Sequence, residues 1–354
     1  MNPLRRDVAV SSRLGKHVPA LGSVPVDDAQ ALAAKVAAVS TDRTHVIGMA
    51  ETATGLGFLV AQALGAKTFT TTTRRDLSHE CSALQFLETH SHAPSHGLCS
   101  SMKTYVEAGD TIVIVDDEAT TGRTLSNLAL PLSRAIPPDV GLVAAVLCDA
   151  SPSSQHDSLL AARISLHQVA STSTGGPEGL TPPDAALLRQ IGSIQTLEPI
   201  RCPDSAHALD EAAILEMQAV ASLISKRFDH LEPDRTLVIG VEEFMPLPIL
   251  VARHLSCHVQ STTRSPIYTS RDRGYPIRAG WTFPAYTDPS QSAFLYNANT
   301  EHPEWMNAIL LAPGATTGVS ISPSMAGCIH VLSSIFRRVW IQPLCEIRWR
   351  SCAA

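Results

Sequence analysis

The sequence predicts an α/β protein in which a parallel sheet flanked by helices is followed by a second α/β domain, a degenerate copy of the first. Three observations support this prediction. Short β-branched runs are typical of parallel strands that are buried on both faces. Turns rich in glycine or hydroxyl groups follow these runs and lead into apolar helical patterns. Blocks of the first half recur in the same order 190 to 196 residues later.

The strands of the first half are expected at residues 45–49, 67–73, 112–115, 141–148 and 163–169. Apolar residues at helical spacing predict a helix at residues 58–64, another after the third strand, and a long one at residues 205–228. A stretch rich in Ser, Thr, Gly and Pro at residues 171–183 predicts a flexible loop. We therefore expect one domain at residues 1–200 and a second at residues 201–354.

Composition narrows the functional class. The chain has 354 residues, and 44% of them are hydrophobic, so it can bury the cores of two domains. A net charge of −6 gives no electrostatic reason to expect a nucleic-acid partner. No apolar run has the length of a membrane span, the N-terminus lacks a secretory h-region, and the eight cysteines include no CxxC pair. We expect a cytoplasmic protein that acts on small molecules.

Residues 111–126 form the most informative stretch of the sequence. The apolar run at residues 112–115 is followed by Asp116 and Asp117, and then by a hydroxyl-rich turn. Carboxylates at the end of a parallel strand lie where open α/β sheets bind ligands. Backbone N–H groups and hydroxyls at the start of a helix are suited to phosphate. An ordinary strand–turn–helix with a solvated acidic pair is the alternative.

This stretch resembles the 5-phosphoribosyl 1-pyrophosphate (PRPP) loop of type I phosphoribosyltransferases. The resemblance lies in four apolar residues, two acids, two further residues and then Thr-Thr-Gly-x-Thr. It implies that Asp116 and Asp117 hold the 2′- and 3′-hydroxyls of the ribose. It also implies that the 5′-phosphate is held by the hydroxyls of Thr120, Thr121 and Thr124 and by the backbone of the loop residues Ala119, Thr120, Thr121, Gly122, Arg123 and Thr124.

A second turn of this kind follows the strand at residues 45–49. A strand, a glycine-rich turn and a helix make an anion-binding arrangement. Only Gly55 and Gly57 of a GxGxxG pattern are present, so a dinucleotide site is disfavoured. By resemblance, the turn takes the place of the pyrophosphate loop, and Glu51 stands where orotate phosphoribosyltransferase often has a lysine. The candidate contacts of this turn are Glu51, Thr52, Ala53, Thr54 and Gly55.

Two basic clusters are candidates for contacts with anions. Arg74 and Arg75 end the strand at residues 67–73, and guanidinium groups match phosphate oxygens; a surface salt bridge is the alternative. The orotate enzyme has an Arg-Lys pair at the corresponding place, where it touches the phosphates. Arg13, Lys16 and His17 surround a glycine near the N-terminus, and either contact an anion or form a solvated turn.

A histidine-rich segment lies between Glu80 and Met102. In type I enzymes this position belongs to a mobile loop that closes over the bound pyrophosphate. Such a lid excludes water and brings hydrogen-bonding groups to the leaving group. A histidine there can donate a hydrogen bond to phosphate and also transfer a proton. The candidates are His92, His96 and Lys103; a structural metal held by the histidines would lack a fourth ligand.

The second half repeats the first with one decisive change. The sequence Thr262-Thr263-Arg264 corresponds to residues 72–74, and residues 309–321 correspond to the PRPP-like stretch. Ala312 and Pro313 stand at the positions of the two aspartates, so this copy cannot hold a ribose diol in the same way. Arg264 and the remaining hydroxyls could still bind a phosphate-bearing group. Alternatively, the second half only packs against the first.

The string Thr263-Arg264-Ser265-Pro266 adds a resemblance that covers nearly the whole chain. The chain is similar to bacterial proteins of tellurium-resistance and stress-response operons. These proteins join an orotate-like phosphoribosyltransferase domain to a C-terminal domain named TRSP for this motif. The resemblance implies a nucleotide or a nucleotide-like product.

The resulting hypothesis is a Mg²⁺-dependent phosphoribosyltransferase that uses PRPP and a base-like acceptor. Asp116 and Asp117 would favour positive charge on the ribose and hold Mg²⁺ indirectly, through ribose or water, while Arg74, Arg75 and the histidine segment would favour negative charge on pyrophosphate. The alternatives are the reverse pyrophosphorolysis of a nucleotide and a non-catalytic regulator that binds PRPP or a nucleotide. Many type I enzymes dimerise, so a homodimer is a further hypothesis.

Overall fold

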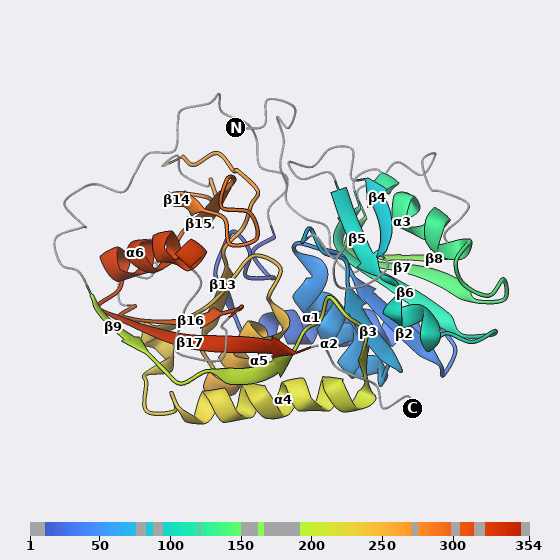
Figure 1. Cartoon of the computed structure of the whole chain (residues 1–354), viewed down its shortest axis with the longest axis horizontal. Coiled ribbons are helices and arrows are strands. Elements are labelled where there is room, and N and C mark those ends of the chain that lie inside the picture. The colour runs from blue at the N-terminus through green and yellow to red at the C-terminus, as the bar shows by residue number, and fades with distance from the viewer. Residues whose placement is uncertain are drawn as a thin grey trace. The chain divides into compact units, whose positions relative to one another are not determined.

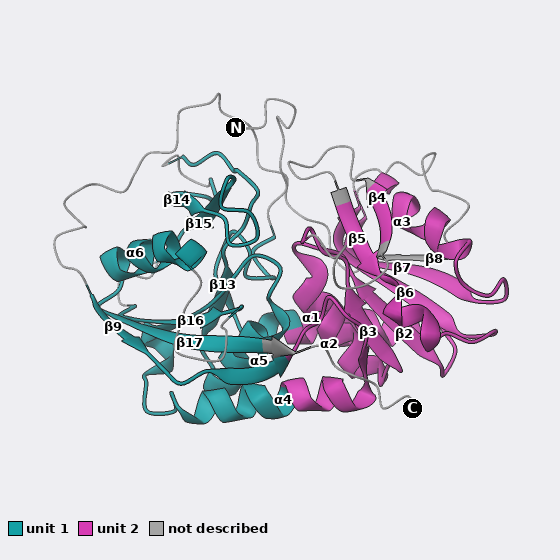
Figure 2. Cartoon of the chain, in the orientation of Figure 1, with its two compact units in different colours: residues 1–25, 169–202, 218–347 teal, residues 26–168, 203–217, 348–354 magenta. Residues whose placement is uncertain are grey.

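The computed structural model describes residues 11–75, 83–87, 95–119, 122–149, 162–165, 192–270, 275–298, 305–314 and 323–347. The chain forms two compact units, which Figure 2 distinguishes by colour. Unit 2 contains residues 26–168, 203–217 and 348–354. Unit 1 contains residues 1–25, 169–202 and 218–347. Neither unit is a continuous stretch of chain, so both differ from the expected consecutive domains at residues 1–200 and 201–354.

The core of unit 2 is a six-stranded sheet (Figure 1) in the order β11-β3-β2-β6-β7-β8. Its strands are β2 (Thr44–Gly48), β3 (Thr68–Thr71), β6 (Thr111–Ala119), β7 (Gly141–Asp149), β8 (Ala162–Ser165) and β11 (Leu209–Asp210). All neighbouring strands are parallel except β11, which runs antiparallel to β3. The α/β class and the parallel sheet predicted from the sequence are therefore confirmed.

Helices and a hairpin complete unit 2. Its helices include most of α1 (Ser23–Ala37), together with α2 (Ala53–Leu64) and α3 (Arg123–Ser133). The hairpin of β4 (Ala83–Leu87) and β5 (Ser95–Cys99) leads into the short 3₁₀ helix η1 (Ser100–Thr104). Helix α2 packs on β2, β3 and β6. A Cβ on Gly57 would lie 2.7 Å from the Cα of Gly48, so this close packing requires glycine.

Unit 1 is built around a second sheet, in the order β1-β13-β12-β16-β17-β10, with β9 also paired to β17. Its strands are β1 (Ala20–Leu21), β9 (Ser193–Thr196), β10 (Ile200–Pro203), β12 (Thr236–Gly240), β13 (His258–Ser261), β16 (Asn307–Ala312) and β17 (Arg338–Ile347). The remaining elements are most of α4 (Glu211–Lys226), η3 (Pro233–Arg235), α5 (Pro246–Leu255), the hairpin β14 (Gly280–Pro284) and β15 (Ser292–Tyr296), η4 (Pro323–Met325) and α6 (Ala326–Ile335).

The two sheets share one topology. The parallel strands β13-β12-β16-β17 of unit 1 correspond to β3-β2-β6-β7 of unit 2, and each sheet carries a short antiparallel strand at the same edge. The registers agree as well: Ala20 pairs with Val259 in one sheet, and Leu209 pairs with Phe69 in the other. The second α/β unit is therefore a copy of the first, as the repeated sequence blocks predicted.

The two edge strands are exchanged between the halves of the chain. Strand β1 precedes helix α1, but it pairs with β13 in the sheet of unit 1. Strand β11 precedes helix α4, but it pairs with β3 in the sheet of unit 2. Each half therefore contributes its leading segment to the sheet that the other half builds.

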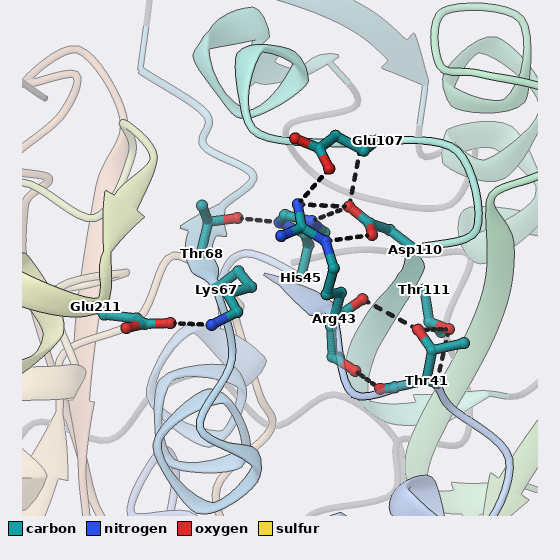
Figure 3. A network of polar contacts seen from close by, with 10 residues as sticks. Thr41, Arg43, His45, Lys67, Thr68, Glu107, Asp110, Thr111 and Glu211 are labelled. Atoms are coloured by element: carbon teal, nitrogen blue, oxygen red, sulfur yellow. Dashed lines mark hydrogen bonds and ion pairs between the residues drawn. The ribbon is translucent and has the colours of Figure 1, made fainter. Parts of the chain in front are cut away.

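An ion-pair network ties together the starts of β2, β3 and β6 (Figure 3). The Asp110 carboxylate accepts hydrogen bonds from Arg43 Nε at 2.8 Å and from the Glu107 N–H at 2.8 Å. His45 is buried, and its Nε2 lies 2.9 Å from Asp110 Oδ2 while its Nδ1 lies 2.8 Å from Thr68 Oγ1. Burial lowers the pKa of His45, and a neutral ring protonated at Nε2 satisfies both contacts.

Several predicted boundaries differ from those observed. Strand β6 continues past Val115 to Ala119, so the two aspartates lie within the strand rather than after it. Helix α2 begins at Ala53, and helix α4 begins at Glu211 rather than at Ser205. The loop expected at residues 171–183 lies outside the described residues. No described helix has both the length and the apolar character needed to cross a membrane.

Candidate functional site

Three acidic residues lie at the carboxyl end of β6, between β2 and β7 in the middle of the unit 2 sheet. Asp116, Asp117 and Glu118 are all half-buried, and Ala119 is buried. The Asp117 N–H donates a hydrogen bond to Asp116 Oδ1 at 2.9 Å. Side chains alternate along a strand, which puts Asp116 and Glu118 on the same face of the sheet. Glu118 is an acidic neighbour that was not among the predicted site residues.

The turn after β6 has one feature suited to a phosphate loop. Gly122 has a φ of 72°, in the left-handed region that favours glycine, and it directly precedes helix α3. Its carbonyl accepts hydrogen bonds from the Ser126 N–H and hydroxyl, both at 3.0 Å. Arg123 is exposed and Thr124 is half-buried. Thr120 and Thr121 lie outside the described residues, so their phosphate contacts stay predictions.

The turn after β2 is tied to the end of β3. The Ala50 N–H donates to Thr72 Oγ1 at 2.8 Å, and the Ala50–Glu51 peptide bond is cis. Ala53, Thr54 and Gly55 are buried in the first turn of α2, and the Thr54 hydroxyl donates to the Glu51 carbonyl at 3.3 Å. Thr52, just before the helix, is half-buried. Three of the predicted pyrophosphate contacts, Ala53, Thr54 and Gly55, are therefore packed into the core.

Glu51 and His96 both contact Arg74. The buried Glu51 carboxylate accepts from Arg74 Nη1 at 3.4 Å, and His96 Nε2 accepts from Arg74 Nε at 3.3 Å. The acid that replaces the expected lysine thus balances the charge of an arginine. Because the carboxylate and the imidazole meet different nitrogens, they fix the direction of the guanidinium plane.

The described parts of the histidine-rich segment form the β4–β5 hairpin and the 3₁₀ helix η1. His96 lies in β5 of a regular antiparallel hairpin, is fully buried, and packs its ring 5.1 Å from the Phe86 ring. His96 is therefore a buried strand residue, and the predicted lid stays a prediction because residues 88–94 lie outside the described residues. Lys103 is half-buried in η1 after the hairpin. His92 falls outside the described residues, so its predicted role stays a prediction.

Arg75 makes an ion pair, the alternative that the sequence left open for it, but the partner is a buried residue that the sequence did not identify. Its Nη2 donates to both oxygens of Asp204, at 2.7 and 3.0 Å, and His207 Nδ1 lies 3.5 Å from Asp204 Oδ2. Burial alone would raise the pKa of Asp204. The nearby His207 ring, the charge and hydrogen bond of Arg75 and the Ala206 N–H instead hold that pKa well below its usual range. The predicted domain boundary at residue 200 had assigned Asp204 to the other domain.

The N-terminal basic cluster belongs to the other unit. Arg13, Lys16 and His17 are part of unit 1, and the Gly15 carbonyl accepts the Ser261 N–H at 2.7 Å. Arg13 is exposed and Lys16 is half-buried. His17 is buried, with its ring 5.8 Å from that of Tyr296, and burial together with the charge of Lys16 holds its pKa well below 6.5. A neutral, buried His17 does not fit the predicted role as an anion contact.

In unit 1, the turn after β12 corresponds to the turn after β2 of unit 2, but its side chains make different contacts. The buried Glu242 carboxylate accepts from the Tyr286 N–H and from the Thr287 hydroxyl, both at 2.6 Å. Arg264 Nη1 donates to the same Thr287 hydroxyl at 3.4 Å. The counterpart of Glu242 in unit 2 is Ala50, since both backbone N–H groups donate to the corresponding threonine. Arg264 therefore shares a hydroxyl with an acid that has no equivalent in unit 2.

The fold and the acidic strand end define the class of protein. A parallel α/β unit carries two aspartates at the carboxyl end of its central strand, and a left-handed glycine then opens a helix. Residues 1–174 match the family described as phosphoribosyl transferase, and residues 205–317 match the TRSP domain found C-terminal to that family. The chain thus joins a phosphoribosyltransferase domain to a C-terminal TRSP domain, which confirms the domain architecture that the resemblance implied. The link to tellurium-resistance and stress-response operons stays a prediction.

Solved structures of adenine phosphoribosyltransferases are among the similar folds. The enzyme of Rhodothermus marinus is 18% identical over 40% of this chain and 77% of its own, with a TM-score of 0.32. The Saccharomyces cerevisiae enzyme is 14% identical over 41% and 79%, with a TM-score of 0.32. The Trypanosoma brucei enzyme is 10% identical over 45% and 75%, with a TM-score of 0.31. We assign no acceptor from likenesses at this level. No curated protein matches this chain.

Proposed function

We propose that the chain is a Mg²⁺-dependent phosphoribosyltransferase, which moves ribose 5-phosphate from PRPP to a base-like acceptor and releases pyrophosphate. The observation that carries the proposal is the acidic pair Asp116-Asp117, half-buried at the carboxyl end of β6 in a domain that matches the phosphoribosyl transferase family. Ligands of open α/β sheets bind at this edge of the sheet.

The proposed reaction needs no covalent enzyme intermediate. The bond from C1′ to the pyrophosphate oxygen breaks, the bond from C1′ to the acceptor nitrogen forms, and the proton of that nitrogen passes to the released pyrophosphate or to solvent. Positive charge develops on the ribose ring and negative charge on the leaving pyrophosphate. Asp116 and Asp117 stabilise the first by their charge, because partial burial strengthens electrostatic interactions.

Arg74 and Arg75 stabilise the charge on the leaving pyrophosphate. Both guanidinium groups are already oriented, Arg74 by Glu51 and His96 and Arg75 by Asp204. Donors fixed in advance need no reorganisation as charge develops, which is where most electrostatic catalysis arises. The neighbouring carboxylates also keep these half-buried arginines from being uncompensated charges.

The chemistry of the site residues fits magnesium that arrives with the substrate. Among the described residues, no group of three or more His, Cys, Asp or Glu side chains is arranged to hold a metal. Mg²⁺ needs only one or two carboxylates and completes its shell with waters and substrate phosphates, and Asp116 and Asp117 can supply that contact through water or ribose oxygens. When bound, the ion neutralises part of the pyrophosphate charge.

A non-catalytic regulator that binds PRPP or a nucleotide is the second candidate. The observation that favours it is the pairing of Arg74 with the buried Glu51, since a phosphate must share this arginine with a carboxylate. Pyrophosphorolysis of a nucleotide is the reverse of the proposed reaction and uses the same residues.

Pyrophosphate release with a panel of purine and pyrimidine acceptors, in the presence of PRPP and Mg²⁺, tests the proposal. Any ligand that co-purifies with the chain, identified by mass spectrometry, adds to the panel. The double variant Asp116→Asn, Asp117→Asn should lose at least about 100-fold in turnover. Asp139→Asn removes an exposed acid from the opposite end of the sheet and is the matched control. Full activity in the double variant would refute the site.

The same assay separates the candidates. PRPP binding without pyrophosphate release for any acceptor would favour the regulator. Nucleotide consumption on addition of pyrophosphate would show that the reverse direction is open to the enzyme. A wild-type chain that binds neither PRPP nor a nucleotide would exclude both candidates.

A further inference from the structure

One segment of the C-terminal half is built into the phosphoribosyltransferase unit. Residues 203–217 belong to unit 2, although the chain continues directly from them through α4 into unit 1. Strand β11 pairs with β3, and the Ser205 carbonyl accepts both the N–H and the hydroxyl of Thr71, at 2.8 and 3.2 Å. These contacts seat the segment at the carboxyl end of β3, where Arg74 and Arg75 follow.

Within this segment, Asp204 forms an ion pair with Arg75, which is one of the predicted pyrophosphate contacts. Its side chain is 7% exposed, and it accepts hydrogen bonds from Arg75 Nη2 and from the Ala206 N–H at 3.0 Å. The Arg75 side chain is 20% exposed. The Asp204 carboxylate is therefore more deeply buried than the Arg75 guanidinium. Part of Arg75 faces solvent, while the buried carboxylate fixes its position.

Stability alone does not explain a buried ion pair of this kind. Removing two charges from water is unfavourable, and well-packed apolar residues often stabilise a fold as much or more. The segment also has a second ion pair to the same sheet, between Lys67 Nζ and Glu211 Oε1 at 2.6 Å, and both of these side chains are exposed. One segment thus offers a buried pair beside the candidate site and an exposed pair away from it.

We propose that Asp204 is the positioning residue for Arg75, so that a segment of the C-terminal half completes the pyrophosphate contact of the phosphoribosyltransferase unit. This inference rests on the proposed function, because it assigns Arg75 to the pyrophosphate of PRPP. It gives a physical reason for joining the two halves in one chain: the first half without residues 203–217 lacks the carboxylate that orients Arg75.

Ligand binding to full-length variants tests the proposal. Isothermal titration calorimetry of Asp204→Asn should show a loss of affinity on the order of 100-fold for PRPP and for inorganic pyrophosphate, since misplacement of a charged contact by about 1 Å has effects of this size. Affinity for ribose 5-phosphate, which lacks the pyrophosphate, should stay within about twofold of wild type. Glu211→Gln removes a carboxylate from the same segment and should leave all three affinities unchanged.

The outcomes are decisive in either direction. A uniform loss of affinity for all three ligands would mean that Asp204 only supports the fold, and unchanged pyrophosphate binding would also overturn the proposal. If Asp204→Asn does not fold, Asp204→Glu keeps the charge one methylene further out, and the same contrast between pyrophosphate and ribose 5-phosphate applies.

Failure of the proposed function is distinguishable from failure of this inference. If the wild-type chain binds neither PRPP nor pyrophosphate, the proposed function is wrong. Crystal structures of the two variants then still decide whether Asp204 positions Arg75. The Arg75 guanidinium must move in Asp204→Asn and keep its place in Glu211→Gln; an unmoved Arg75 in Asp204→Asn would overturn the positioning role.

Discussion

Replacing Asp110 with asparagine should destabilise unit 2 by about 1 to 2 kcal/mol at neutral pH. Asp110 is buried at the start of β6, in the network shown in Figure 3. Burial would raise the pKa of Asp110, but hydrogen bonds from Arg43, from the Glu107 N–H and from His45, together with the charge of Arg43, lower it from 3.8 to about 2. The ionised carboxylate is therefore bound more favourably in the folded than in the unfolded chain.

The magnitude follows from this pKa difference. A pKa lowered from 3.8 to about 2 corresponds to roughly 2 kcal/mol of stability from the ionised group. Arg43 is 45% exposed, so water screens its contribution. The expected destabilisation therefore extends down to about 1 kcal/mol. The unfolded state takes up a proton near pH 3.8 and the folded state only near pH 2. The stabilisation is therefore present above about pH 5 and is lost as the pH falls toward 2.

Hydrogen exchange in increasing urea, read on peptides from β2 and β6, measures the free energy of unfolding of this unit. The difference between wild type and Asp110→Asn should fall to about half near pH 3. Glu211→Gln, which breaks an exposed ion pair of the same unit, should change the stability by less than about 0.5 kcal/mol. Equal stability of wild type and Asp110→Asn at pH 7, or a difference that does not shrink in acid, would refute the reasoning.

Two further predictions concern packing and pH. Gly57→Ala should destabilise unit 2 by about 1 to 3 kcal/mol, because the added Cβ would lie 2.7 Å from the Gly48 Cα. Thermal unfolding measures this loss of stability. The control is Gly65→Ala, whose Cβ meets no atom within 4 Å and which therefore tests backbone strain alone. His17→Gln should make unit 1 less sensitive to acid. Burial keeps His17 neutral when folded, so wild-type stability falls below pH 6.5, by up to about 1.4 kcal/mol per pH unit. Urea unfolding followed by tryptophan fluorescence, to which Trp281, Trp305 and Trp340 of unit 1 contribute, checks this, and identical pH profiles would contradict it.

The fold and the acidic centre of the site could be predicted from the sequence because their signals are local. A parallel strand buried on both faces must be a continuous apolar run, as residues 112–115 are, and all four are fully buried in β6. Asp116 and Asp117 break that run at the edge where ligands bind. The duplication was also visible, because two copies of one topology keep apolar blocks at similar spacing.

The contacts around the two arginines could not be predicted in this way. Glu51 occupied a position where a phosphate contact was expected, but its carboxylate meets Arg74 across two strands. His96 stood among loop-forming residues, and only its packing against Phe86 and Arg74 shows that it is buried in a hairpin. The Glu51–Arg74 and Arg74–His96 pairs join residues more than 20 positions apart in the chain, and sequence periodicity carries no information about them.

The sequence by itself thus determined that the chain contains two copies of an α/β unit. It also determined which copy keeps the acidic pair that is the candidate for ribose binding. Only the tertiary structure decided which chain segments belong to each unit. Strands β1 and β11 have two residues each, too few for any periodic signal, and their place depends on hydrogen bonds to strands in the other half of the chain. Those long-range pairings bring Asp204 to Arg75, and they make residues 203–217 of the second half a structural part of unit 2.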